Sequence, residues 1–214
     1  MPNYRILTPC GASDVTITFP STSGTLALSG AGLTGFIPSQ NTAAPNNTVN
    51  ASRLLVDAAS TNADIVLQPK GTGAFLAQLP DNAATGGNKR GAYAVDLQMQ
   101  RSSGGQSAIG ANSVISGGAN NLVGAQYGTI SGGLQNSVYA GGTNATISGG
   151  TLNQSYGIAS FVGGGSSNIA SQNYAVVGGG ISNQATQPYA SVVGGDSNVA
   201  QSLYSVVAGG QSNN

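Results

Sequence analysis

The side chains that could carry catalysis in this chain are few and widely spaced. The 214 residues include no histidine and one cysteine, Cys10, so the Ser-His-Asp and Cys-His mechanisms lack their base and a zinc site lacks its ligands. A carboxylate pair for glycoside hydrolysis could in principle come from four of the aspartates, namely Asp57, Asp64, Asp81 and Asp96. Because scattered aspartates in a turn-rich sequence usually form turns, we expect no enzymatic activity.

Two glycine-containing motifs have some features of phosphate or metal sites. The stretch from Lys70 to Gly73 lacks the upstream glycine of a phosphate-binding loop and does not begin a helical pattern. The turn that ends in Asp196 has the form of one calcium-binding turn, but the equivalent turns elsewhere carry no acid. We therefore expect neither a cofactor nor a metal ion.

Charge and hydropathy argue against two further classes of partner. Six basic residues balance six acidic ones, so the attraction that dominates nucleic-acid binding is missing. No apolar run approaches the length of about 18 residues that a membrane span requires, so we expect no membrane insertion. The charged group of Lys89, Arg90, Asp96 and Arg101 predicts either contacts between chains or a solvated surface.

The strongest pattern is a repeat in the C-terminal half, where seven copies of Gly-Gly-x-x-Asn follow one another. The interval is 15 residues, except for one interval of 17 in which Gly141 and Gly142 indicate a loop insertion. The second glycines are Gly118, Gly133, Gly150, Gly165, Gly180, Gly195 and Gly210. The asparagines three residues later are Asn121, Asn136, Asn153, Asn168, Asn183, Asn198 and Asn213. The β-branched residues three positions before each second glycine are Ile115, Ile130, Ile147, Val162, Val177, Val192 and Val207.

A 15-residue period is too short for a helical hairpin and fits two short strands with two tight turns, one turn of a β-solenoid. Glycine and asparagine tolerate the left-handed backbone conformation that such turns need. Stacking would place the Ile/Val column inside and would join the asparagine amides into a ladder. A tyrosine column, which predicts a packing ladder or a glycan-contacting surface, consists of Tyr127, Tyr174, Tyr189 and Tyr204.

Each turn offers one Ile or Val and one smaller apolar residue, a thin core against a conformational cost of about 1–2 kcal/mol per residue. Between residues 102 and 214 the only charged side chain is Asp196, so little opposes contact between chains. We therefore expect several chains to share the core, with a closed homotrimer as the natural arrangement. The alternatives are a monomeric solenoid and a disordered Gly/Ser/Asn-rich tract.

The N-terminal half shows short alternating segments typical of strands. Residues 15–19 and 25–28 alternate on either side of a turn and predict a β-hairpin. Residues 35–52 are typical of a linker, whereas 53–57, 65–69 and 93–99 predict further strands. The overall fold class expected is all-β.

The repeats resemble those of two classes of fibrous protein. Residues 106–113, 175–185 and 191–200 are similar to the head repeats of trimeric autotransporter adhesins, a family that folds as a left-handed parallel β-roll of three chains. The period here is one residue longer, and the tyrosine column is an addition. Residues 19–28, 65–73 and 86–98 resemble segments of bacteriophage tail fibres, which also carry Gly-Gly-x-x-Asn repeats.

The second resemblance implies a homotrimeric tail or baseplate fibre, located in the virion after assembly in the host cytoplasm. Its expected parts are a virion-attachment β-region at 1–34, a linker at 35–52, β shaft modules at 53–105 and a β-roll stem at 106–214 that continues or docks at its C-terminal end. Its expected partners are further copies of the chain, phage baseplate or tail proteins, and a host cell-surface receptor. The alternatives are a bacterial trimeric adhesin fragment, a capsid-decorating head fibre and, further removed, a depolymerase tailspike.

Overall fold

The computed structural model describes residues 4–6, 15–17, 37–40, 50–53 and 67–214. These residues belong to two units, 1–67 and 68–214, and each unit is described by itself. The first unit contains two antiparallel strand pairs. Strand β1 (Tyr4–Ile6) pairs with β2 (Val15–Ile17), and β3 (Ile37–Gln40) pairs with β4 (Asn50–Arg53).

The N-terminal strands overlap the sequence predictions in part. Strand β2 falls within the predicted hairpin, but its partner is β1, and the predicted partner at 25–28 lies outside the described residues. Strands β3 and β4 lie near the two ends of the segment predicted to be a linker, and the residues between them lie outside the described part of the chain. Of the strand predicted at 65–69, the described residues 67–69 form no strand, and Pro69 lacks the backbone donor that a ladder needs.

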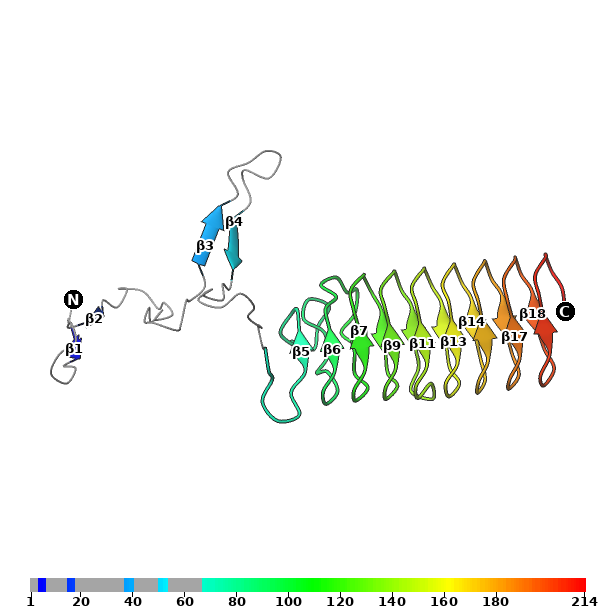
Figure 1. The fold of residues 1–214 in the computed structure, drawn as a ribbon, viewed down its shortest axis with the longest axis horizontal. Helices are drawn as coiled ribbons and strands as arrows, with labels where there is room; N and C mark the ends of the chain where they lie inside the picture. The colour runs from blue at the N-terminus through cyan, green and yellow to red at the C-terminus, as the bar shows by residue number, and fades with distance from the viewer. Residues whose placement is uncertain (1–3, 7–14, 18–36, 41–49, 54–66) are drawn as a thin grey trace, which may run out of the picture. The chain divides into compact units, whose positions relative to one another are not determined.

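The second unit is a β-solenoid, in which each turn of chain stacks on the turn before it (Figure 1). Its larger sheet has nine parallel strands, and their order in the sheet follows their order along the chain. These strands are β5 (Phe75–Leu76), β6 (Val95–Asp96), β7 (Val114–Ile115), β9 (Thr129–Ile130), β11 (Thr146–Ile147), β13 (Phe161–Val162), β15 (Val176–Val177), β17 (Ser191–Val192) and β19 (Val206–Val207). The prediction of an all-β solenoid with turns of about 15 residues is confirmed.

A second parallel sheet lies on another side of each turn and has six strands. These are β8 (Leu122–Val123), β10 (Ser137–Val138), β12 (Gln154–Ser155), β14 (Ile169–Ala170), β16 (Gln184–Ala185) and β18 (Val199–Ala200). Single-residue parallel bridges from Ala119 through Leu134 to Gln211 add a third ladder along the stack. Each strand has two residues, and in most of them the second is buried, as the alternation of side chains across a strand requires.

The solenoid sheet begins earlier in the chain than the repeat pattern does. Strands β5 and β6 lie in the segment assigned to shaft modules from its sequence, yet they pair in parallel with each other and with β7. Both segments lack the Gly-Gly-x-x-Asn signature, so no repeat marks them as solenoid turns.

The core runs along the inside of the stack as columns of small and β-branched side chains. The predicted aliphatic column is fully buried from Ile115 to Val192, and Val207 is partly buried. The second sheet contributes Val123, Val138 and a run of alanines, and the turns contribute further alanines. Because the equivalent residues of the two adjacent parallel strands cover each inward side chain, small residues suffice to fill the interior.

This burial corrects the physical premise of the trimer expectation. The sequence predicts that the aliphatic column must be shared between chains, whereas a single chain already buries it completely from Ile115 to Val192. The premise counts one turn alone, whereas equivalent side chains in the turns above and below cover each inward residue, and alanines of the turns such as Ala175 and Ala190 add to the core. Association between two solenoids would therefore have to use their outer surfaces.

The two extra residues of the long interval form part of one turn. Within it the backbone N–H of Gly142 donates to the carbonyl of Tyr139, and that of Ala145 donates to Gly142. Immediately afterwards Thr146 pairs with Thr129 in the same register as every other strand of the sheet. The insertion therefore leaves the stack undisturbed.

Candidate functional site

The predicted asparagines lie at one turn of each solenoid coil and form a continuous hydrogen-bond ladder. The Oδ1 atom of Asn168 accepts the backbone N–H of Asn183 at 2.9 Å, and its Nδ2 donates to the carbonyls of Gly164 at 2.8 Å and Gly180 at 2.9 Å. The ladder asparagines from Asn121 to Asn198 all repeat this pattern and are fully buried, whereas Asn213 ends the ladder. Each of these side chains thus joins its own turn to the next turn along the stack, and its backbone N–H is bound by the asparagine of the turn before.

The ladder differs in its chemistry from the sequence prediction of bonds between amides. Nearly all partners are backbone groups, because the inward amide lies level with the carbonyls of the glycine turns. Among the described residues, amide-to-amide bonds occur only from Asn198 to Asn183 at 3.2 Å and from Asn213 to Asn198 at 3.0 Å.

The glycine turns are sterically required. Gly133 has φ of 90°, and a Cβ atom there would collide with the carbonyl oxygen of Gly150 in the next turn. The second left-handed position is not the ladder asparagine but the residue before it, as at Gln135 with φ of 57° and Leu152 with φ of 59°. The sequence gives no sign of this position, since it is occupied by Asn, Gln, Leu and Ser in turn.

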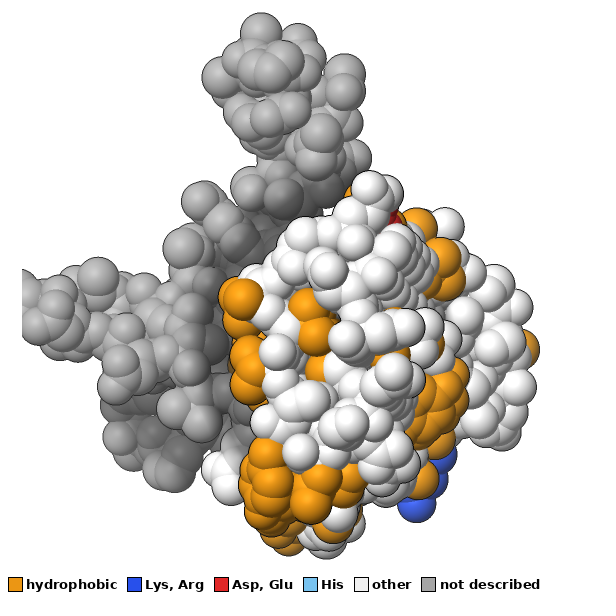
Figure 2. Space-filling view, turned by 90° about the vertical axis from the view of Figure 1, so that its right-hand side faces the viewer, with side chains coloured by type: hydrophobic (Ala, Val, Ile, Leu, Met, Phe, Trp, Pro, Cys, Tyr) orange, Lys and Arg blue, Asp and Glu red, His pale blue; other side chains and the backbone are white. Residues whose placement is uncertain are grey.

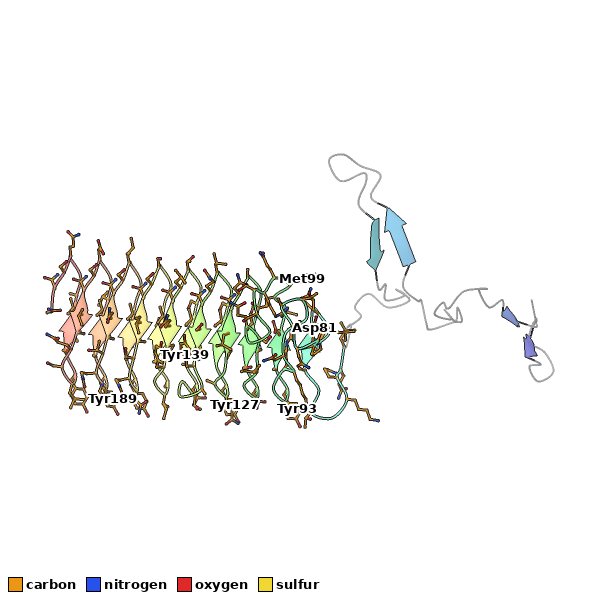
Figure 3. The ribbon with its side chains drawn as sticks, turned by 180° about the vertical axis from the view of Figure 1, so that it is seen from behind. Asp81, Tyr93, Met99, Tyr127, Tyr139 and Tyr189 are labelled. Carbon is orange, nitrogen blue, oxygen red and sulfur yellow. The ribbon has the colours of Figure 1, made fainter. Side chains whose placement is uncertain are left out.

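The tyrosine column follows the opposite turn of the solenoid, and Tyr93, Tyr127 and Tyr189 lie along the same edge (Figure 3). All of its members have left-handed backbone, with φ between 57° and 59°. Tyr93 shares this conformation and extends the column beyond the residues predicted, because the spacing before the first repeat is irregular.

The stacked tyrosines contact one another through their ring faces. The ring centroids of Tyr174 and Tyr189 are 4.8 Å apart, and those of Tyr189 and Tyr204 are 4.9 Å apart. A separate stack, missed in the sequence, joins Tyr139 and Tyr156 at 4.4 Å, and burial together with Tyr139 raises the pKa of Tyr156. Faces that are occupied by neighbouring rings leave mainly ring edges for a glycan, so the geometry favours the packing interpretation.

The charged residues near the start of the solenoid form a buried cluster within one chain. Asp96 stands in the inward column next to Ile115, where every later turn has an aliphatic residue. Its Oδ2 lies 2.7 Å from Nε of Arg90 and 3.0 Å from Nη2 of Arg101. The two sequence interpretations, contacts between chains or a solvated surface, are therefore both wrong for these three residues, whereas Lys89 is exposed.

Gln98 begins the asparagine ladder two residues after Asp96. It is fully buried, and its Oε1 accepts the backbone N–H of Asn121 at 2.9 Å, as each ladder asparagine does for the next. Its Nε2 donates to the carbonyls of Gln106 and Asn121, both at 2.8 Å. The sequence misses Gln98 because no glycine pair precedes it.

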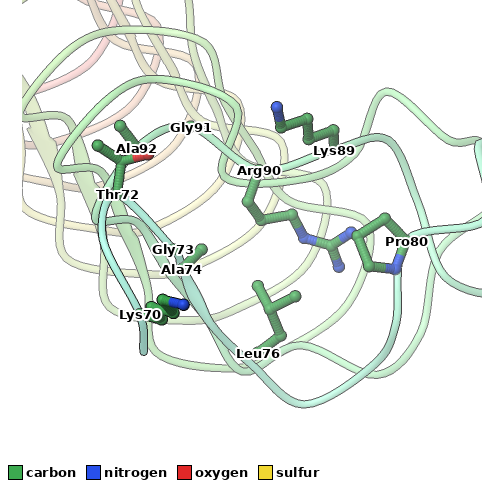
Figure 4. A pocket seen from close by; sticks show the side chains of 10 residues that line it. All are labelled: Lys70, Thr72, Gly73, Ala74, Leu76, Pro80, Lys89, Arg90, Gly91 and Ala92. Carbon is green, nitrogen blue, oxygen red and sulfur yellow. The ribbon is translucent and has the colours of Figure 1, made fainter. Parts of the chain in front are cut away.

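A pocket of about 660 Å³ lies beside this cluster, between the first two solenoid strands and the loop that joins them (Figure 4). Lys70, Lys89 and Arg90 contribute positive charge to its lining, together with apolar side chains such as Leu76 and Pro80. This pocket has no counterpart in the sequence predictions, because its residues come from both sides of the loop.

The aspartates considered for catalysis are not available as a hydrolytic pair in the described part of the chain. Asp96 is held in its ion pairs, and Asp57 and Asp64 lie outside the described residues. Asp81 is exposed, and the backbone N–H of Ala83 holds the pKa of its carboxyl below the ordinary value. Within residues 67–214 and the short N-terminal strands, no cluster of three or more potential metal ligands occurs.

Comparison with known proteins leaves the family open. No protein-family model matches the chain, and no curated protein matches it in sequence. In the described segments, no helix has the length and apolar character that a membrane crossing requires.

Proposed function

We propose that this protein is a structural subunit of a bacteriophage fibre, a homotrimer of the tail or baseplate that attaches through its N-terminal part and supports adhesion to the host cell. The observation that carries the proposal is the unbroken parallel ladder from β5 to β19, which makes the solenoid a rod. The resemblance of residues 19–28, 65–73 and 86–98 to tail-fibre segments supports the phage assignment.

A mechanical role fits the way in which the solenoid is held together. Nine strands stacked at about 4.8 Å give a rod of roughly 40 Å, bonded along its length by backbone ladders and by the asparagines. Bending would have to break several of these ladders at once, since each turn is bonded to both neighbours. Such an element transmits force and holds a distal site away from its base.

The outer surface of the rod supports association between copies. The outward residues of the larger sheet include Phe161, which is 37% exposed, and Val206, which is 68% exposed. Apolar side chains also gather at several places around the end-on view of the solenoid (Figure 2). With Asp196 as the only charge beyond residue 102, packing these faces together would desolvate almost no charge.

Light scattering on the purified full chain tests the assembly. A homotrimer would give about three times the chain mass of 20.9 kDa, independent of dilution, whereas a mass of one chain would contradict the proposal. The trimer should also remain after the salt concentration is raised, because apolar contact is not screened.

Antibody labelling of virions and of producing cells tests the location. Label on the tail or baseplate is the expected result. Label on the capsid would identify a head fibre instead, and label on bacterial surfaces without particles would identify an adhesin. Release of oligosaccharide from host polysaccharide by the purified trimer would indicate a depolymerase.

A further inference from the structure

The beginning of the solenoid buries more positive charge than negative charge. Arg90 and Arg101 both contact the single carboxylate of Asp96, and the three side chains are at most 1% exposed. Two guanidinium groups face one carboxylate, so the cluster has one unit of excess positive charge. Buried charge without a counter-charge is unfavourable, which makes this end of the solenoid attractive to anions.

Arg90 also has donor capacity that the described residues leave unused. Its Nε binds Asp96, and its Nη1 donates to the carbonyls of Gly86 and Asn88. Its Nη2 is buried and has no hydrogen-bond partner among the residues that the structure describes. Arg101, by contrast, uses all three nitrogens, since it also donates to Gln78, Gln98 and Gln106.

The pocket beside Arg90 adds two further cations to this excess charge. Its lining includes Lys70 and Lys89, both exposed, and includes no acidic residue. The guanidinium of Arg90 lies between Leu76 and Pro80 in the close-up view (Figure 4). At about 660 Å³ the pocket lies within the usual range of roughly 300–1,000 Å³ for small-molecule sites.

We propose that this pocket is an oxyanion site, which binds a carboxylate or a phosphate group. The two lysine ammonium groups supply the direct hydrogen bonds, and the buried excess charge of the arginine cluster adds attraction from behind. Because Nη2 of Arg90 is covered, the site does not require a direct bond from it. The ligand class follows from the charges alone and is independent of the fibre assignment.

The experiment titrates the full-length protein with inorganic phosphate and, separately, with malonate, by calorimetry at constant ionic strength set with sodium chloride. Lys70→Gln and Lys89→Gln each remove one pocket cation without disturbing a described hydrogen bond. Gln187→Glu makes the same change in net charge at an exposed position far along the solenoid and serves as the matched control.

Saturable binding of either anion in the millimolar range is expected, with each lysine substitution raising Kd by roughly 2- to 5-fold and the control leaving it unchanged. Binding of phosphate alone, or of malonate alone, assigns the site to that chemistry. Absence of saturable binding for both would overturn the proposal, as would a double lysine variant that binds like the unaltered protein. An equal loss in Gln187→Glu would also overturn it, since net charge rather than the pocket would then be responsible.

Discussion

Replacing one ladder asparagine tests how far the ladder stabilises the solenoid. In Asn168→Ala, the backbone N–H of Asn183 loses its only described acceptor, and the carbonyl of Gly164 loses its described donor. The carbonyl of Gly180 keeps a second bond, from the backbone N–H of Ser166. The buried N–H left unpaired costs about 1–3 kcal/mol and the partly buried carbonyl about 1 kcal/mol, so the expected loss in the free energy of unfolding is about 2–4 kcal/mol.

Calorimetric melting at a fixed protein concentration is the assay, and a fall in Tm of roughly 5–15 °C is expected. Asn173→Ala is the matched control, because this exposed asparagine accepts a single backbone N–H, that of Ile158, at the opposite turn of the same coil. Its loss should stay within about 1 kcal/mol. Equal Tm values for the two variants would refute the assignment of the inner ladder as a main source of stability.

The remaining predictions concern the core and its polar end. Val177→Asp places a carboxylate in the buried aliphatic column and should lower the Tm strongly, whereas Gln187→Asp changes an exposed residue and should hardly lower it. Equal shifts in Tm and equal sedimentation of the two variants would contradict the inward position of Val177. Asp96→Asn removes the counter-charge that the described residues give to two buried guanidinium groups and should destabilise by about 3–5 kcal/mol, so a variant that unfolds like the parent in a urea titration would count against the ion-pair cluster. Asn168→Asp introduces a buried carboxyl whose pKa is raised above its unfolded value, so stability should be greatest at acid pH and should fall as the pH rises through the folded pKa; a Tm that rises with pH relative to the parent would refute this sign.

The periodic part of the structure could be predicted from the sequence because an Ile or Val, a glycine and an asparagine recur at fixed positions in all seven repeats. Val177 and its equivalents are buried, and Asn168 and its equivalents occupy one turn, as the constant spacing indicates. A shift of one residue in the strand pairing would turn the whole aliphatic column outward, so the pattern allows only one register of the strands.

The start of the solenoid could not be predicted, because residues of other types occupy the positions that hold Ile or Val and Asn in the later turns. Asp96 occupies an aliphatic position, and Gln98 takes the part of a ladder asparagine. Both depend on partners that the fold brings together, Arg90 and Arg101 in one case and Asn121 in the other. In the sequence alone, a charged residue at a core position indicates that the repeat has ended, because the arginines that pair with it are not adjacent to it in the chain.

The turn that carries Gly141 and Gly142 shows that length can change at this edge without shifting Thr146 against Thr129. This edge of the solenoid can therefore change in length while the parallel ladders on either side of the insertion keep their register. Insertions in this turn would alter the exposed surface of the solenoid without altering the strand pairing that holds it together.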